Sequence, residues 1–237
     1  MRRVVWFSCG AASAVLAKLA KPDEIVYCDT LAEEHPDNRR FLDDVSAWCQ
    51  QPITVIKSQR YTSISDVFQR TRYMAGIAGA RCTVEMKKLP REAWQRETDV
   101  HLFGYTAEEV KRAERFEKQN PSLHVEWPLI ELGISKKDTL RLLAEAHIEL
   151  PAMYALGFEH NNCIGCVKST SAGYWNLVRR QFPDTFALRA RQSRLLGVRL
   201  VRWRGVRIFL DELPATADAP QDDIDCGPVC QSPVTEE

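Results

Sequence analysis

The sequence contains no long apolar run and no excess of charge of one sign. None of its apolar segments approaches the roughly 20 residues that a membrane helix needs, so no membrane partner is expected. Lysine plus arginine and aspartate plus glutamate both total 32 in a chain of 237 residues, which argues against attachment to polyanions through overall charge. The first residues also carry no long apolar signal segment, and we expect a cytoplasmic protein.

Cysteine is scarce for a chain of this length, at 8 of 237 residues, which excludes a secreted disulfide scaffold. Four of the cysteines form two close pairs, Cys163/Cys166 and Cys226/Cys230. In a reducing compartment such pairs are typical of metal or redox chemistry. The remaining four stand singly and are expected to be small buried apolar residues unless their context says otherwise: Cys9, Cys28, Cys49 and Cys82.

The hydrophobic pattern of the first part of the chain alternates between strands and helices. Strands are predicted at 2–8, 24–29 and 53–56, with helices at 12–20 and 36–50 between them. Successive βαβ units require a parallel sheet. We therefore predict an α/β fold with a Rossmann-like doubly wound parallel sheet.

The later pattern is more mixed. Residues 64–98 are predicted to be mostly helical, with a loop around 76–82, followed by a short strand at 101–103. Ser135 is the expected N-cap of a helix over 135–147, residues 151–165 are predicted to be loop, and helix 174–182 and hairpin 199–210 follow.

These patterns divide the chain into three expected parts. They are a nucleotide-binding α/β domain over 1–150, a cysteine-containing helical and hairpin extension over 151–213, and a flexible cysteine-containing tail over 214–237 that is rich in proline and aspartate.

The stretch Ser8-Cys-Gly-Ala-Ala-Ser13 joins the first predicted strand to the first helix. Small residues there expose backbone amides at the positive end of a helix, an arrangement that suits phosphate or sulfate. The stretch has neither the Walker pattern nor the GxGxxG pattern, and a turn that uses small residues only for packing is the alternative. Ser8, Gly10 and Ser13 are the candidate contacts.

This loop resembles the pyrophosphate-binding loop of the adenine nucleotide α-hydrolase superfamily, in which ATP pyrophosphatases carry Ser-Gly-Gly-x-Asp-Ser. Cys9 replaces the first glycine and Ala12 the aspartate, and the phosphoadenosine phosphosulfate (PAPS) reductase family relaxes the same loop. Further segments resemble that family in the same order: 27–38, 81–90, 104–112 and 127–129. In the second of these, Thr83 and Met86 replace a cysteine and an arginine.

The resemblance implies an adenylyl nucleotide as ligand: PAPS, adenylyl sulfate or ATP, with Mg²⁺ if ATP is used. The nucleotide contacts that it implies are Ser8, Gly10, Ser13, Asp29, Thr30, Lys87, Gly104 and Arg112.

Cys163 and Cys166 are spaced so that both thiolates can bind one tetrahedral metal centre. Cys82 matches a cluster cysteine of the adenylyl-sulfate reductase subgroup, and the resemblance implies it as a third ligand. Cys226 or Cys230 would be the fourth. The implied cofactor is a [4Fe-4S] cluster, with zinc as the alternative.

The tail supports a competing assignment. Asp225-Cys226-Gly227 resembles the Glu-Cys-Gly-x-His tail of PAPS reductases, whose cysteine attacks the sulfonate sulfur. This implies Cys226 as the catalytic nucleophile, Cys230 as a resolving thiol, and thioredoxin or glutaredoxin as the thiol reductant. The sequence leaves open whether Cys226 is nucleophile or ligand.

The late third of the chain is rich in arginine, with Trp175 and Trp203 interspersed. The arginines are Arg179, Arg180, Arg189, Arg191, Arg194, Arg199, Arg202, Arg204 and Arg207. This pattern predicts either a nucleic-acid face or a surface balanced by the acidic tail.

Three functions are compatible with these features. The leading hypothesis is an oxidoreductase of sulfur metabolism that reduces adenylyl sulfate or PAPS to sulfite. The alternatives are an ATP-dependent iron–sulfur enzyme that transfers sulfur to nucleic acid, as in phosphorothioation or thiolation, and an inactive nucleotide-sensing interaction protein. The sequence sets no oligomeric state, and a homo-oligomer is compatible with it.

Overall fold

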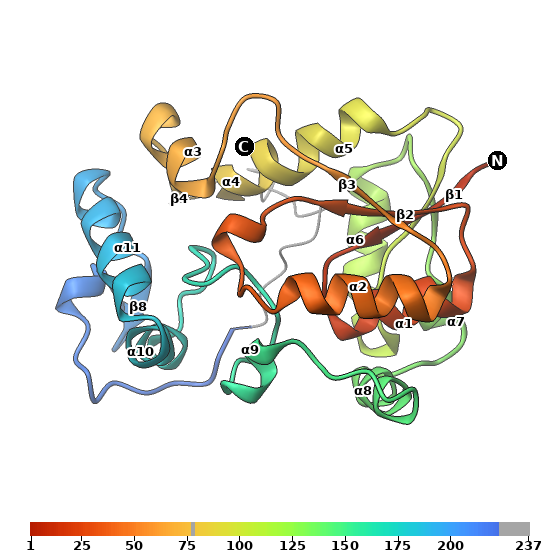
Figure 1. The fold of residues 1–237 in the computed structure, drawn as a ribbon. Helices are drawn as coiled ribbons and strands as arrows, with labels where there is room; N and C mark the ends of the chain where they lie inside the picture. The colour runs from red at the N-terminus through yellow and green to blue at the C-terminus, as the bar shows by residue number, and fades with distance from the viewer. Residues whose placement is uncertain (77–78, 223–237) are drawn as a thin grey trace.

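A five-stranded parallel sheet organises the first half of the computed structural model, which describes residues 1–76 and 79–222 (Figure 1). Its strands are β1 (Arg3–Phe7), β2 (Glu24–Cys28), β3 (Ile53–Ile56), β6 (Val100–Leu102) and β7 (His124–Glu126). Their order is β3-β2-β1-β6-β7, and every pairing is parallel. The order reverses direction between β1 and β6, so the predicted doubly wound α/β fold is confirmed.

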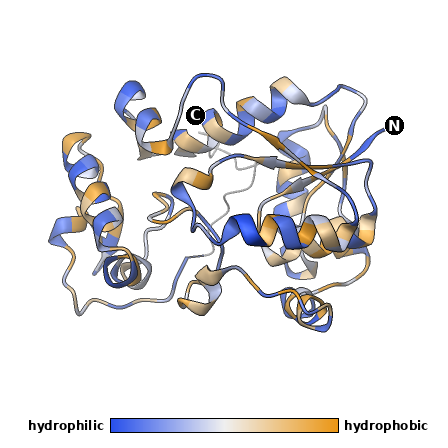
Figure 2. Ribbon diagram, in the orientation of Figure 1, coloured by the Kyte–Doolittle hydropathy of each residue, from blue (hydrophilic) through white to orange (hydrophobic). Residues whose placement is uncertain are grey.

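Helices cover both faces of the sheet because its strands are apolar on both sides. Val5 and Phe7 point to the face that packs against α1 (Ala11–Ala20), α2 (Asn38–Cys49) and α8 (Lys136–Glu145). Val4 and Trp6 alternate with them and pack on the opposite face, together with residues of α5 (Leu89–Trp94) and α6 (Val110–Gln119). Figure 2 shows strands in hydrophobic colours between helices that carry residues of both kinds.

A second hydrophobic core lies beside the sheet. It combines residues of α3 (Ile64–Thr71) with α10 (Ala172–Gln181), α11 (Pro183–Leu195) and the hairpin of β8 (Val201–Trp203) and β9 (Val206–Ile208). Residues 61–86 thus share a core with residues 153–217, although more than sixty positions of sheet domain separate them in the sequence. This core carries the cysteine segments.

The remaining elements are short. They are η1 (Leu31–Glu33), β4 (Ala75–Gly76), β5 (Gly79–Ala80), α4 (Arg81–Thr83), the π-helical η2 (Val84–Lys88), η3 (Ala107–Glu109), α7 (Pro128–Glu131), α9 (Ala152–Ala155) and η4 (Leu210–Glu212). Nowhere in residues 1–76 and 79–222 is a helix long and apolar enough to cross a membrane.

Most predicted elements are confirmed, and the exceptions have physical reasons. The first three strands, the hairpin at β8–β9 and the Ser135 cap of α8 are present, and the Ser135 hydroxyl accepts a hydrogen bond from the Asp138 amide. Residues 151–165 were expected to be loop but contain α9. Helix α11 and strand β7 were not predicted, because the apolar residues of α11 do not follow one face and β7 is only three residues long. Tertiary packing stabilises both.

Candidate functional site

A cleft of about 440 Å³ opens at the carboxyl ends of β1 and β6. These neighbouring strands flank the point where the strand order reverses, which is where doubly wound folds bind ligands. The predicted nucleotide contacts that line the cleft are Ser8, Gly10, Ser13, Lys87, Gly104 and Arg112. The sheet topology therefore brings together residues from Ser8 to Arg112, which lie far apart in the chain.

The loop between β1 and α1 is held in shape by its own last serine. Ser13 is 3% exposed, and its hydroxyl oxygen accepts from the amides of Ser8 (3.2 Å) and Gly10 (3.4 Å). The same hydroxyl donates to the carbonyl of Gly10 (3.0 Å). Ser13 thus fixes the loop from inside, while Ser8 and Gly10 remain half-buried at the cleft.

Cys9 occupies a backbone conformation that usually favours glycine. Its φ of 58° lies in the left-handed region, at the position where the resembling superfamily has a glycine. The side chain is buried, and its thiol donates to the carbonyl of Asn38 (3.6 Å). Burial raises the pKa of this thiol well above its usual value, and burial likewise raises the pKa of Cys28 to about 12. Both cysteines are therefore buried thiols with structural roles.

Gly104, just after β6, lies against the backbone of Ser13 at the start of α1. A Cβ atom there would lie 2.8 Å from the backbone nitrogen of Ser13 and 2.9 Å from its Cα. No side chain fits without moving the start of α1 away from the end of β6. A glycine is therefore needed at position 104 for steric reasons, and its nucleotide contact stays a prediction.

The β6 wall of the cleft ends in a stack of flat side chains. The guanidinium of Arg112 lies 4.3 Å from the centre of the Tyr105 ring, and Tyr105 stacks on Trp127 with 4.9 Å between ring centres. Arg112 also forms an ion pair with Glu109. This predicted phosphate contact is therefore held on one side of the cleft by an aromatic face and a carboxylate.

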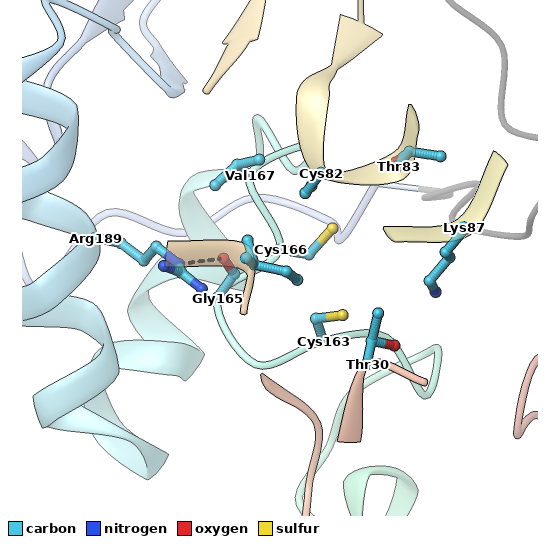
Figure 3. A pocket seen from close by; sticks show the side chains of 10 residues that line it. Thr30, Cys82, Thr83, Lys87, Cys163, Gly165, Cys166, Val167 and Arg189 are labelled. Carbon is cyan, nitrogen blue, oxygen red and sulfur yellow. Dashed lines mark hydrogen bonds between the residues drawn. The ribbon is translucent and has the colours of Figure 1, made fainter. Parts of the chain in front are cut away.

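Three predicted metal ligands meet at a second, much smaller cavity (Figure 3). Cys82, Cys163 and Cys166 line it together with Thr30, Thr83, Lys87 and Arg189. Figure 3 shows the sulfur atoms of Cys163 and Cys166 on one loop, with Lys87 and Thr30 on the facing side. The cavity volume is about 10 Å³, which is room for about one water molecule.

Two helices fix the loop that carries Cys163 and Cys166. The Tyr174 hydroxyl accepts from the amide of Cys166 (2.7 Å) and donates to the carbonyl of Cys163 (3.4 Å). Gly165, with a φ of 68°, makes the turn between the cysteines, and its carbonyl accepts from Arg189 Nε (3.4 Å). Helices α10 and α11 thus hold both cysteines in place through the loop backbone.

The sequence analysis placed Arg189 among the arginines of a candidate surface, and the structure shows this placement to be wrong. It is 1% exposed, and its guanidinium pairs with Glu33 at 2.7 Å. It also donates to the Ser65 hydroxyl (3.1 Å). A buried, paired guanidinium beside three thiols is a positioning group, and only the tertiary contact with Glu33 distinguishes it from its neighbours in the sequence.

Lys87 lines both the cleft and the cysteine cavity. It is 9% exposed and comes from the π-helical turn η2, a conformation often found at functional sites. Its backbone carbonyl accepts from the thiol of Cys28 at the end of β2 (3.6 Å). The cleft and the cavity are therefore adjacent, with a cationic side chain at their boundary.

The two remaining predicted nucleotide contacts do not line the cleft. Thr30 lines the cysteine cavity, and its hydroxyl donates to the buried carboxylate of Glu34. Asp29 is not among the residues that line the cleft or the cavity, and its carboxylate caps the amide of Leu31 (3.0 Å). Both residues shape the turn after β2.

The donor set of the cavity suits a thiophilic metal, but the described part of the chain is not a complete site. No group of three or more His, Cys, Asp or Glu residues in 1–76 and 79–222 is arranged to hold a metal ion. A tetrahedral centre needs a fourth donor, and Cys226 and Cys230 lie outside the described residues. At its present volume the cavity has room for a single ion, and a cluster would need the three thiols to move apart.

The comparisons with known proteins find a likeness to a solved structure and no match to a family model or a curated sequence. Among solved structures, it is similar to the phosphate complex of phosphoadenylyl-sulfate (PAPS) reductase from Candida auris, with 14% identity and a TM-score of 0.48 over 68% of this chain and 80% of that chain.

Proposed function

We propose that the protein binds an adenylyl nucleotide in the cleft and carries out cysteine-based sulfur chemistry at its phosphate end. The observation that carries this proposal is the position of Lys87, which lines both the cleft and the cysteine cavity. An ammonium group at that boundary neutralises phosphate or sulfate oxygens as a point charge. The loop motifs at Ser8–Ser13 and Gly104 provide the other contacts in the same cleft.

The proposed reaction reduces adenylyl sulfate or PAPS to sulfite. The Cys226 thiolate attacks the sulfur, and the S–O bond to the phosphate breaks with its electron pair leaving on the nucleotide. The product is a Cys226 thiosulfonate. Cys230 or a dithiol reductant of the thioredoxin or glutaredoxin class then attacks the Cys226 sulfur, and sulfite leaves with the electron pair of the broken S–S bond. The two thiols have supplied the two electrons of the reduction and end as a disulfide, which a further dithiol reduces when Cys230 is the attacking thiol.

The segment around Asp222, the last described residue before Cys226, supports the assignment of Cys226. Asp222 accepts hydrogen bonds from the Ser171 amide (2.8 Å) and the Ser169 hydroxyl (3.1 Å), just after the segment with Cys166. Cys226 follows Asp222 by four positions. Four residues span at most about 14 Å, and Asp222 is itself bonded to residues that follow Cys166 by three and five positions.

The cysteines of the cavity are proposed as metal ligands, and a tail cysteine that completes the metal site is not the one that reacts. Cys82, Cys163 and Cys166, with Cys226 or Cys230, would hold a [4Fe-4S] cluster or zinc. Either centre would lock the thiol-bearing loop beside the phosphate end of the cleft and supply a fixed charge there. Anaerobic purification with iron, sulfide and zinc analysis tests this. Metal in the native protein that is lost in Cys163→Ser and kept in Cys49→Ser supports the assignment, and a metal-free native protein contradicts it.

Sulfite release tests the reaction. Adenylyl sulfate and PAPS are supplied with a dithiol reductant, and sulfite is measured for the native protein, Cys226→Ser and Cys49→Ser. Cys49 is a matched control because it lies at the end of α2, outside the cleft and the cavity. We expect Cys226→Ser to lose activity and Cys49→Ser to keep it. Full sulfite release by Cys226→Ser would contradict the nucleophile assignment.

A second candidate function is sulfur transfer to nucleic acid with ATP, in which case Mg²⁺ would accompany the nucleotide. The observation that favours it is the β8–β9 hairpin, where Arg202, Arg204 and Arg207 are exposed and form no ion pair with described residues. The Arg202 amide donates to the carbonyl of Thr170 (2.8 Å), which ties the hairpin to the segment after Cys166. By contrast, Arg194 is paired with Asp211 and Glu212.

Pyrophosphate release from ATP separates the two candidates. Release that requires an added oligonucleotide, and that falls with the triple change of Arg202, Arg204 and Arg207 to alanine, would support nucleic-acid modification. Arg141→Ala is the control, because it removes an exposed arginine on α8, away from the hairpin. Sulfite release without pyrophosphate release favours the reductase.

A further inference from the structure

The side chain of Asn161 joins the cysteine loop, residues 161–168, to the loop between β1 and α1. Its amide nitrogen Nδ2 donates to the backbone carbonyl of Cys9 (2.6 Å) and to Oδ1 of Asn38 (2.9 Å). Asn161 is 7% exposed and precedes Cys163 by two positions. A loop that lines the cleft is therefore bonded directly to the loop that carries two cysteines of the cavity.

The partners of Asn161 fix the orientation of its amide. The Cys9 carbonyl has no hydrogen to donate, so the nitrogen of Asn161 must face it. Nδ2 of Asn38 donates to the Glu34 carboxylate (2.6 Å), which leaves Oδ1 of Asn38 to accept from Asn161. The Tyr27 hydroxyl holds the same carboxylate (2.7 Å). A rotated Asn161 amide would set oxygen against oxygen twice, so both of its contacts depend on one orientation.

The carbonyl that Asn161 binds belongs to a peptide unit of the cleft wall. Because a peptide unit is planar and trans, the Cys9 carbonyl and the Gly10 amide point in opposite directions and turn together. Ser13 Oγ holds the amide end (3.4 Å), and Asn161 holds the carbonyl end. Gly10 is half-buried and lines the cleft. A phosphate or sulfate oxygen bound by the amides of this loop would therefore also fix the carbonyl that Asn161 contacts.

The cysteine loop has two backbone bonds that report whether it is closed. The Ile164 amide donates to the Glu33 carbonyl (2.8 Å), and the Cys166 amide donates to the Tyr174 hydroxyl (2.7 Å). Amides in such bonds exchange their hydrogens with solvent only when the segment opens. Their exchange rates therefore measure the opening of the loop, whether or not a metal is bound to its thiols.

We propose that Asn161 is a positioning residue that couples occupancy of the cleft to closure of the cysteine loop. A nucleotide that fixes the Cys9–Gly10 peptide unit strengthens the contact with Asn161 and so holds Cys163 and Cys166 at the cavity. By linkage, the nucleotide binds more tightly when the loop is closed than when it is open. The cysteines are thus positioned when the nucleotide is present. This inference rests on the proposed nucleotide site.

Hydrogen exchange with and without nucleotide tests the coupling. The probe is adenosine 5′-phosphate, kept well above the dissociation constant that calorimetry gives for each protein, and exchange is followed by mass spectrometry of peptides that cover 161–168. With the native protein, the nucleotide is expected to slow exchange of the Ile164 and Cys166 amides about tenfold. Asn161→Asp keeps the size of the side chain but replaces the donor by an oxygen. In this variant the nucleotide should change exchange by less than about twofold.

The ratio of the two rates separates coupling from simple stabilisation of the loop. If Asn161 only stabilised the loop, Asn161→Asp would speed exchange by the same factor with and without nucleotide, and a ratio that stays tenfold would overturn the proposal. The control is Asn120→Ala, which removes a bond to the Phe116 carbonyl (2.9 Å) at the end of α6 and should keep the tenfold ratio. Asn120 lines neither the cleft nor the cavity.

The native protein alone distinguishes failure of this inference from failure of the proposed function. If adenosine 5′-phosphate binds and exchange over 161–168 does not change, the coupling is overturned while nucleotide binding stands. This arm needs no variant, so poor folding of Asn161→Asp cannot rescue the proposal. If adenosine 5′-phosphate does not bind, the proposed function fails and the inference fails with it.

Discussion

The cleft and the cysteine cavity share Lys87, but they are built in different ways. The cleft walls follow β1 and β6, two neighbouring strands whose carboxyl ends meet by the topology of a parallel sheet. The cavity walls come from Thr30, η2, the Cys163–Cys166 loop and α11, which meet only through side-chain packing and buried polar contacts. The cleft should therefore tolerate changes in the second core, and the cavity should not.

The largest expected effect comes from breaking the buried pair between Arg189 and Glu33. In Arg189→Leu, the carboxylate of Glu33 loses its partner and the Gly165 carbonyl loses a donor. We expect a loss of about 3–5 kcal/mol in the free energy of unfolding, measured by urea titration. Nucleotide affinity at temperatures where the variant is folded should stay within about twofold of the native value.

Arg194→Leu is the matched control on the same helix. Arg194 pairs with Asp211, but both side chains are more than 40% exposed, so its loss should cost less than about 1 kcal/mol. Equal losses for the two variants would contradict the distinction between a packed cavity wall and a solvated surface pair.

The free energy of unfolding, measured as a function of pH, should contain a contribution from a group of the sheet, His101, that lies outside the second core. His101 on β6 is 1% exposed, and its Nδ1 accepts from Trp6 Nε1 (2.9 Å). Burial lowers the pKa of His101 from 6.5 to about 4. Between these pH values the imidazole is protonated in the unfolded chain and neutral in the folded protein. The free energy of unfolding therefore decreases as the pH falls from 6.5 to about 4. The expected loss is about 3 kcal/mol from this group.

His101→Gln keeps an acceptor for Trp6 and removes the titrating group. The free energy of unfolding of the native protein should fall more steeply than that of the variant between pH 6.5 and pH 4. Identical slopes would show that His101 does not titrate in this window.

The smallest effect is expected where the two walls of the cleft touch. Gly104→Ala places a Cβ atom 2.8 Å from the Ser13 nitrogen, so the start of α1 must shift. We expect nucleotide affinity to fall about tenfold, which is about 1.4 kcal/mol. Gly10→Ala is the comparison, because its Cβ would lie 3.7 Å from the nearest atom and should weaken binding less. A stronger effect at Gly10 would reverse this ranking.

The local parts of the site could be predicted from the sequence because their geometry follows from neighbouring residues. A strand, a small-residue turn and a helix place Ser8, Gly10 and Ser13 together, and the next strand across the reversal adds Gly104. The nucleotide roles of all these residues, and those of Asp29, Thr30, Lys87 and Arg112, stay predictions, with Thr30 at the cavity instead of the cleft. The roles of Cys226 and Cys230, and the domain division at residue 150, also stay predictions.

The sequence by itself determined the doubly wound sheet, the loop at its first strand and the cysteine spacing, because these depend on patterns within short segments. Only the tertiary structure decided that Cys82 meets Cys163 and Cys166, that Arg189 is buried against Glu33, and that the Asn161 amide nitrogen donates to the Cys9 carbonyl. Such contacts join residues far apart in the chain. They are selected by packing and by the cost of leaving buried polar groups unpaired, which no local pattern records.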